Sequence, residues 1–217
     1  MSATEAALNG LLDEIRNEGV QDEHVLSAMR KVDRALFVPA DSRELAYANT
    51  PLLIGQGQTI SQPLVVGLMT QALDVRPDSK VMEVGTGSGY QTAVLAELAS
   101  EVISVERHAP LAERARELLA RLGYSNVRVH TASGSTGWPS DAPYDRILVT
   151  AGAPRIPVHL VARLKSGGRL VVPVGPRASQ QLIVLDKTAG GLQERVLGEV
   201  RFVPLVGDGA WQEDNGE

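Results

Sequence analysis

Three glycines at alternate positions, Gly85, Gly87 and Gly89, lie where a β-rich run meets a segment of helical composition. Val81–Val84 leads directly into them, and glycines at such a turn let the backbone approach a ligand closely. Dinucleotide sites use the spacing G-x-G-x-x-G, which places a pyrophosphate at a helix N-terminus. The tighter G-x-G-x-G spacing here, with Glu83 two residues ahead of it, favours a ligand without phosphates. S-adenosylmethionine is the common ligand of this kind.

A carboxylate follows the next β-rich run. Glu106 comes directly after Val102–Val105 and 17 positions after Gly89, where a carboxylate can accept hydrogen bonds from both hydroxyls of a ribose. A glycine-rich turn also occurs simply to pack a helix closely against a strand, and that alternative needs no ligand. The glycine loop and the carboxylate together predict a nucleoside-type cofactor.

Few residues are suited to acid–base or metal chemistry. The four histidines, His24, His108, His130 and His159, are scattered without a partner motif, so solvated or structural roles are expected for them. The chain has no cysteine, which excludes disulfides, thiolate metal sites and a cysteine nucleophile. The acidic residues near the C-terminus lack the spacing of metal ligands, so no metal site is expected.

The elements that must position these residues begin at Lys80, where β-rich runs start to alternate with helical ones. This alternation is typical of βαβ units and predicts a doubly wound α/β fold with a mostly parallel sheet. The expected strands are 81–84, 102–105, 127–130, 147–150 and 170–174, and the expected helices are 91–98, 111–122 and 158–164. Two runs flanking Gly190-Gly191 predict a hairpin and Val200–Val203 a last strand, so the sheet is expected to end antiparallel.

Two helices are expected before the first of these strands. Residues 4–18 carry apolar residues at helical spacing and stop at Gly19, and a second helix follows with Asp22 as its N-cap. Residues 41–63 show no clear period, and a long irregular segment in a compact domain is usually functional. We predict one domain, with N-terminal helices and a functional loop over 1–63, an α/β core over 64–206 and a frayed polar tail over 207–217.

Composition limits the class of protein. The chain has 217 residues, of which 43% are hydrophobic, enough to form a core without disulfides. Its formal net charge of −5 disfavours binding to the phosphates of a nucleic acid. No run approaches the roughly 18 apolar residues of a membrane span, and the first residues lack the apolar core of a signal peptide. A soluble, cytoplasmic monomer without nucleic-acid or membrane partners is expected.

The most specific segment is Ile54–Pro63, with the sequence IGQGQTISQP. It resembles the signature of the protein-L-isoaspartate (D-aspartate) O-methyltransferase family, which general methyltransferases lack. The resemblance extends over nearly the whole chain, through Met82–Tyr90, Ser104–Arg107, Pro143–Asp145, Val149–Ala151, Leu164–Pro173 and Arg201–Leu205. It implies a Rossmann-like fold of the S-adenosylmethionine-dependent methyltransferases, with Val203–Leu205 near the active-site wall.

The family resemblance implies a repair activity on isoaspartyl-containing proteins and peptides. S-adenosylmethionine methylates the free α-carboxyl of the L-isoaspartyl residue, and the ester then cyclises to a succinimide whose hydrolysis returns some normal aspartate. A carboxylate is already ionised at neutral pH, so the transfer needs no general base.

The resemblance also assigns roles to individual residues. Ser61 is placed beside the substrate carboxylate, where its hydroxyl donates to an oxygen and orients it, and Thr59 and Ile60 help form the wall facing the cofactor. Without the resemblance, Ser61 would be interpreted as a loop serine bonded to its own backbone. The other expected cofactor contacts are Gly85, Thr86, Gly87, Gly89, Glu106, Ser133 and Gly134.

Two positions depart from the family pattern. Ala132-Ser133-Gly134 replaces a Gly-Asp-Gly turn, so an uncharged hydroxyl stands where a carboxylate is expected at the adenine end of the cofactor. Ala48 stands where an acidic residue is expected, so the following loop is anchored differently or Asn49 substitutes. Because of these departures, a protein that binds the cofactor but has reduced activity stays an open alternative. A peptide-tailoring aspartyl methyltransferase also stays open, whereas the glycine spacing disfavours a nicotinamide-dependent oxidoreductase.

Overall fold

The computed structural model describes residues 3–212 and is built around one large sheet. Its seven strands have the order β5-β4-β3-β6-β7-β8-β9; those from β5 to β7 pair in parallel, and β8 and β9 are antiparallel. The strands are β3 (Lys80–Val84), β4 (Glu101–Glu106), β5 (Val127–Thr131), β6 (Tyr144–Val149), β7 (Leu164–Val174), β8 (Gln180–Thr188) and β9 (Gly191–Val200). The predicted doubly wound fold with an antiparallel end is therefore confirmed.

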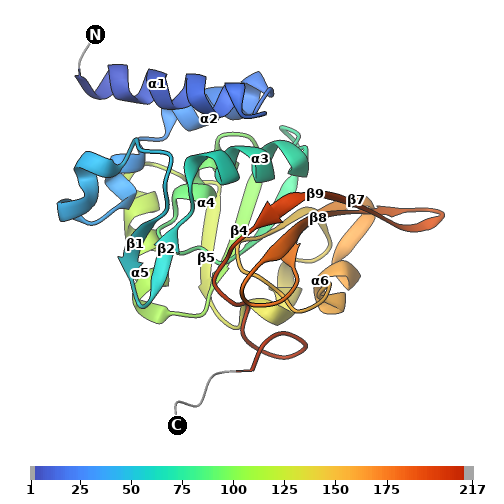
Figure 1. The fold of residues 1–217 in the computed structure, drawn as a ribbon. Helices are drawn as coiled ribbons and strands as arrows, with labels where there is room; N and C mark the ends of the chain where they lie inside the picture. The colour runs from blue at the N-terminus through green and yellow to red at the C-terminus, as the bar shows by residue number, and fades with distance from the viewer. Residues whose placement is uncertain (1–2, 213–217) are drawn as a thin grey trace.

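Helices cover both faces of this sheet (Figure 1). They are α1 (Ala3–Asn17), α2 (Glu23–Lys31), α3 (Pro63–Leu73), α4 (Tyr90–Ala96), α5 (Ala109–Arg121) and α6 (Val158–Ala162). Successive strand residues point to opposite faces. Val81 and Leu148 accordingly pack in a cluster with α3, whereas Met82 and Ile147 pack in a cluster with Leu160 of α6. Among residues 3–212, no helix combines the length and the apolar composition that crossing a membrane requires.

The two N-terminal helices pack over α3 at the upper edge of the view in Figure 1. Asp22 caps α2 as predicted. The side chain of Gln71 in α3 fixes the turn before α2, because its Oε1 accepts hydrogen bonds from the backbone N of Gln21 at 2.6 Å and of Asp22 at 2.8 Å. Residues of α1 and α2 share one hydrophobic cluster with α4 and α5. Helix α3 was not expected from the sequence, and the predicted boundary between residues 63 and 64 falls in its first turn.

The segment 41–63 contains regular structure, contrary to expectation. The strands β1 (Leu52–Gly55) and β2 (Gln58–Ile60) form an antiparallel hairpin outside the main sheet. Gln56 and Gly57 make its turn with φ values of 54° and 66°, as tight hairpins require. Strands of four and three residues are too short to show a convincing alternation in the sequence, which is why the prediction of an irregular segment was wrong here.

The C-terminal part confirms the hairpin and corrects its surroundings. The antiparallel pair β8 and β9 turns at Ala189-Gly190, with Gly191 as the first residue of β9, and its tip projects from the body in Figure 1. The separate strand predicted for Val200–Val203 is wrong, because β9 ends at Val200 and the chain then leaves the sheet. The next residues pair with the loop after β6 instead: Gly152 N donates to Val203 O, and Leu205 N donates to Gly152 O, both at 2.8 Å.

The element ends around α6 and the tail also differ from expectation. Helix α6 ends at Ala162 and β7 starts already at Leu164, where the predicted helix was to end. The first part of the expected frayed tail is ordered, since Trp211 Nε1 donates to Gly152 O at 3.1 Å. Residues 213–217 of that predicted tail lie outside the described part of the chain.

Candidate active site

The main cavity lies at the carboxyl ends of the central strands. The chain crosses from β3 through β4 to β5 on one side and continues with β6 and β7 on the other, so the direction of winding changes between β3 and β6. Ligands of doubly wound sheets bind outside the strand ends at such a switch point. Val84 at the end of β3, Glu106 at the end of β4 and Thr150 after β6 all line this one cavity.

The glycine loop is held against the end of β6. Gly85 has a φ of 100°, and a Cβ added to it would lie 2.3 Å from Thr150 Oγ1. That hydroxyl lies 2.9 Å from Val84 O and 2.7 Å from Gly85 O, so it bonds the loop to the neighbouring strand. Gly87 follows with a φ of 54°. Only glycine adopts this backbone beside Thr150 without strain, which leaves the loop backbone open to the cavity.

Glu106 is fixed by the loop that it faces. Its Oε2 accepts a hydrogen bond from Gly87 N and its Oε1 accepts one from His108 N, both at 2.9 Å. The residue is buried yet lines the cavity. A carboxylate has about four lone-pair positions, so two remain for donors of a ligand. This geometry suits the ribose role predicted for Glu106.

Glu83 supports the loop from below and does not line the cavity. Its Oε2 accepts hydrogen bonds from Thr92 Oγ1 and Ser104 Oγ, both at 2.5 Å. Ser104 has a single hydroxyl proton, which it donates to Glu83. In the contact of 2.5 Å between Thr86 Oγ1 and Ser104 Oγ, the donor must therefore be Thr86. Glu83 Oε1 has no partner among the described residues, and burial raises the pKa of Glu83 to about 7.

The opposite wall of the cavity comes from the β1–β2 hairpin and the residues that follow it. Thr59, Ile60 and Ser61 line the cavity as the chain passes from β2 into α3. Asn49 anchors this passage: its Oδ1 accepts from Leu64 N at 3.0 Å.

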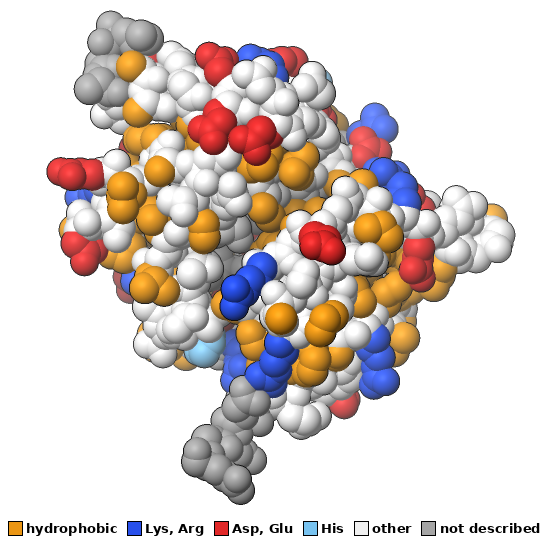
Figure 2. All heavy atoms as spheres, viewed as in Figure 1, with side chains coloured by type: hydrophobic (Ala, Val, Ile, Leu, Met, Phe, Trp, Pro, Cys, Tyr) orange, Lys and Arg blue, Asp and Glu red, His pale blue; other side chains and the backbone are white. Residues whose placement is uncertain are grey.

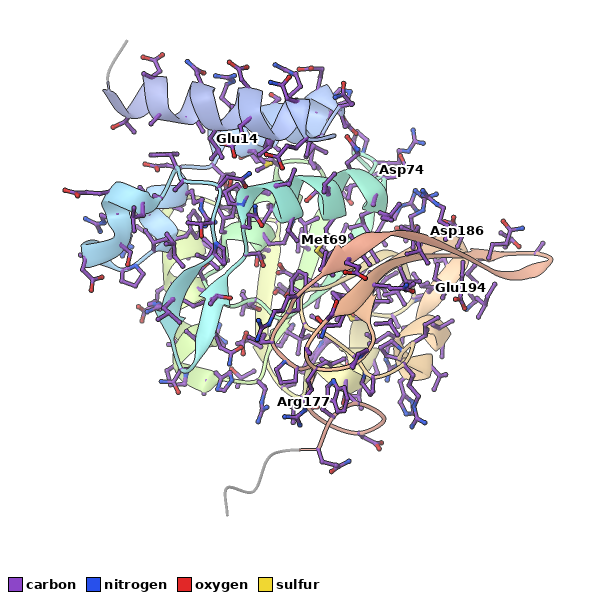
Figure 3. The ribbon with its side chains drawn as sticks, in the orientation of Figure 1. Glu14, Met69, Asp74, Arg177, Asp186 and Glu194 are labelled. Atoms are coloured by element: carbon purple, nitrogen blue, oxygen red, sulfur yellow. The ribbon has the colours of Figure 1, made fainter. Side chains whose placement is uncertain are left out.

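Asn49 also reaches the N-terminal helix. Its Nδ2 donates to Glu14 Oε1 at 2.9 Å, and Glu14, labelled in Figure 3, points from α1 toward the loop region. An aspartate could accept from the backbone of α3 but could not donate to Glu14. Asn49 therefore does anchor the loop, beside an Ala48 that contributes no polar side chain.

Ser61 lies where the main cavity meets a second, open groove. In the part of the chain that the structure describes, its hydroxyl makes no hydrogen bond, so the loop serine bonded to its own backbone is not what the structure shows. Four residues line both spaces: Thr59, Ser61, Thr150 and Val203. The groove is lined further by Pro51, Gln62, Val65, Ser179, Glu199, Val200, Arg201 and Phe202. A free hydroxyl thus lies where the main cavity and the groove meet.

The structure brings most of the predicted site residues together. The predicted residues that line the main cavity are Ser61, Thr59, Ile60, Gly85, Thr86, Gly87, Glu106 and Gly134. Gly89 does not line it: this N-cap of α4 packs against α5, where an added Cβ would lie 3.3 Å from Ala115 Cβ. Ser133 does not line it either, because its Oγ lies 3.2 Å from Ser135 Oγ and beside Gly207.

Other lining residues were not identified from the sequence. Thr150 and Ala151 follow β6, and Tyr90 and Gln91 begin α4. The rule that ligands bind at the carboxyl ends of parallel strands could have indicated Thr150, since it is the last residue of an expected strand. Val203–Leu205 lie on the wall as the resemblance implied.

Three further residues, Trp138, His130 and Asp145, have structural roles. Trp138 stacks on His130 with ring centroids 3.9 Å apart and does not line the cavity, and burial lowers the pKa of that histidine. Asp145 accepts from Lys80 N at 2.8 Å and so ties the starts of two strands together. No group of three or more metal-ligating side chains occurs within residues 3–212.

Comparison with known proteins identifies the family. The family model described as protein-L-isoaspartate(D-aspartate) O-methyltransferase (PCMT) matches residues 6–210. A protein-L-isoaspartate O-methyltransferase from Methanoculleus marisnigri is 53% identical over 199 residues, which cover 92% of this chain and 90% of that protein. One from Myxococcus xanthus is 50% identical over 202 residues, covering 91% of this chain and 95% of that protein.

Solved structures agree with this assignment. A protein-L-isoaspartate O-methyltransferase structure superposes with a TM-score of 0.84 at 28% identity, covering 94% of this chain and 67% of the other. A structure from Plasmodium falciparum, described as a β-aspartate methyltransferase (PCMT) in complex with S-adenosyl-L-homocysteine, gives a TM-score of 0.79 at 28% identity, covering 91% and 97%. The chain therefore belongs to the protein-L-isoaspartate O-methyltransferase family.

Proposed function

We propose that this protein methylates the free α-carboxyl of L-isoaspartyl residues in damaged proteins and peptides, with S-adenosylmethionine as the methyl donor. The observation that carries the proposal is the unbonded hydroxyl of Ser61 at the junction of the main cavity and the open groove. Membership of the family supports both the reaction and the cofactor. Conversion of the methyl ester to a succinimide then needs no further group from the enzyme.

The residues of the main cavity fit this cofactor. Glu106 has lone pairs left for the two ribose hydroxyls, and the backbone of Gly85 and Gly87 lies open beside it. Gly134 closes the pocket where a side chain would not fit, because an added Cβ would lie 2.5 Å from Val84 Cγ1. When bound, S-adenosylmethionine supplies a methyl group on a positively charged sulfur, which a carboxylate attacks without prior proton transfer.

The chain's own part in the reaction is to orient the substrate. The Ser61 hydroxyl donates a hydrogen bond to one carboxylate oxygen of the substrate. The other carboxylate oxygen is then directed toward the main cavity. Thr59 and Ile60 line the main cavity beside Ser61. Alignment of the two reactants in this way supplies much of the rate of a bimolecular transfer. The proposed mechanism needs no histidine base, because the carboxylate is already ionised at neutral pH.

The open groove gives room for an extended polypeptide on either side of the reacting residue. Its lining combines Pro51 and Phe202 with the charged Glu199 and Arg201, a mixture without strong preference for one side-chain type. Discrimination then rests on backbone geometry: an isoaspartyl linkage carries one more methylene in the main chain, which changes where the carboxylate lies relative to Ser61.

We include in this proposal that the protein acts as a monomer in the cytoplasm, without nucleic-acid or membrane partners. The net charge of −5 and the lack of cysteine support it. Acidic side chains lie mainly in the upper half of the face drawn in Figure 2, and basic side chains are more frequent in its lower half.

Transfer of labelled methyl from S-adenosylmethionine to two peptides tests the proposal. The peptides are identical except for isoaspartate or aspartate at one position, and base-labile label is expected on the isoaspartyl peptide only. Ser61→Ala should lower kcat/KM about 10- to 100-fold, because a hydrogen bond to a charged oxygen contributes about 1.5–3 kcal/mol. Ser166→Ala is the control, an exposed serine at the start of β7.

Each alternative outcome has its own meaning. Label on the aspartyl peptide would instead identify a peptide-tailoring methyltransferase. Binding of S-adenosylhomocysteine without transfer to either peptide would identify a cofactor-binding protein and overturn the repair proposal.

A further inference from the structure

Arg34 is a charged side chain enclosed in the protein between the two halves of the site. It is 1% exposed and sits in a short 3₁₀ helix after α2. Its guanidinium has no carboxylate partner in the described part of the chain. Burial of an unpaired charge is unfavourable unless hydrogen bonds compensate, so the hydrogen bonds of Arg34 must offset that cost.

The hydrogen bonds of Arg34 all go to backbone carbonyls of the loop that carries Ser61. Nε donates to Ala46 O at 2.9 Å, Nη2 to Thr50 O at 3.1 Å, and Nη1 to Ser61 O at 2.9 Å. These carbonyls lie before and after the β1–β2 hairpin, so one planar side chain fixes both ends of it. Only arginine offers several donors in a rigid fork of this kind.

The other contact of Arg34 is with the cofactor side of the site. Its guanidinium carbon lies 5.4 Å from the ring centroid of Tyr90, the residue that follows Gly89 and lines the main cavity. A cation over an aromatic face is attracted by the ring's quadrupole. The low polarity of this environment is also seen in the pKa of Arg34, which burial lowers to about 10.

We infer that Arg34 is a positioning residue for methyl transfer: by holding the carbonyls of Ala46, Thr50 and Ser61 against the ring of Tyr90, it sets the position of the Ser61 hydroxyl relative to the cofactor pocket. The inference rests on the proposed function, because it assigns Ser61 to the substrate carboxylate. Arg34 acts through Ser61 and touches neither reactant.

A double-mutant cycle between Arg34 and Ser61 tests this inference. Arg34→Lys keeps the positive charge but cannot reach three carbonyls at once. It should lower kcat/KM for the isoaspartyl peptide about tenfold when Ser61 is present, and less than about threefold in the Ser61→Ala background, because two residues that act as one unit are not additive. The dissociation constant of S-adenosylhomocysteine, measured by calorimetry on the same proteins, should change by less than about threefold.

Arg146→Lys is the matched control. Arg146 is also mostly buried and also donates to two carbonyls, Asp74 O at 2.9 Å and Asp145 O at 3.0 Å. It lies at the start of β6, and Asp74 is labelled at the end of α3 in Figure 3, away from the site. Its effect on kcat/KM should be small and the same with Ser61 or Ala at position 61.

The outcomes separate the inference from the proposed function. Equal losses from Arg34→Lys in both backgrounds, or a loss of cofactor affinity as large as the loss of kcat/KM, would show a general structural role and overturn the inference. If Arg34→Lys does not fold, Arg34→Gln, which retains two N–H donors, takes its place in the same cycle. A wild-type protein without activity on the isoaspartyl peptide would refute the proposed function itself.

Discussion

Replacement of Glu106 by glutamine tests how the main cavity binds its ligand. In the wild-type protein, Gly87 N and His108 N each donate a hydrogen bond of 2.9 Å to one carboxylate oxygen of Glu106. Glutamine keeps only one acceptor oxygen, so its NH₂ group must face one of these two N–H donors. One charged hydrogen bond to the ribose is lost, at about 1.5–3 kcal/mol, so the dissociation constant of S-adenosylhomocysteine should rise about 10- to 100-fold. Titration calorimetry measures this directly.

The same substitution should also lower the stability of the free protein. A buried N–H without an acceptor costs about 1–3 kcal/mol, which a urea denaturation curve resolves. Glu101→Gln is the control at the other end of β4, where Glu101 pairs with Arg128 at 2.6 Å on the surface and its loss should leave cofactor affinity unchanged. A Glu106→Gln protein that is less stable but binds the ligand with wild-type affinity would refute the ribose role and leave Glu106 only as a support of the loop.

Three further predictions concern the loop and its surroundings. Gly85→Ala should destabilise the protein by about 1–3 kcal/mol in urea denaturation, since its Cβ would lie 2.3 Å from Thr150 Oγ1 at a φ of 100°; an unchanged midpoint would contradict the close contact. Glu83 keeps its proton in the folded protein up to a pKa of about 7 but loses it near 4.5 when unfolded, so the free energy of unfolding should fall by up to about 3 kcal/mol between those pH values. Glu83→Gln cannot lose a proton and should show a flatter pH dependence; an identical slope in both proteins would rule out this assignment. Ser133→Ala should leave the dissociation constant of S-adenosylhomocysteine within about twofold, because Ser133 Oγ is directed at Ser135 and Gly207, and a tenfold loss in calorimetry would return Ser133 to the cofactor site.

The cofactor half of the site was predictable from the sequence because its parts are local. Gly85 and Gly87 lie in the loop that begins where β3 ends, Glu106 is the last residue of β4, and parallel strands bring their carboxyl ends to one edge of the sheet. Gly89 shows the limit of this reasoning. Its spacing matches the loop, yet the structure uses it to pack α4 against α5, a contact with Ala115 that no local pattern contains.

Helix α3 and the β1–β2 hairpin could not be predicted for a different reason. Helix α3 is covered by α1 and α2 on one side and by the sheet on the other. Its first turns are therefore apolar on several sides, with Leu64, Val65, Val66 and Leu68. A helix that is buried all round has no amphipathic period to detect. The signature Ile54–Pro63 located the loop but contained no information on its support.

That support explains why the two halves of the site should respond differently to substitution. The cofactor residues extend from strands of the main sheet, whose ladder hydrogen bonds fix them. Ser61 follows a small hairpin outside the sheet, and its backbone is held by side chains from elsewhere: Arg34 at its carbonyl and Asn49 at the start of α3. Substitutions at the strand ends should therefore change cofactor affinity, whereas substitutions in the supports of the hairpin should change kcat/KM with little effect on that affinity.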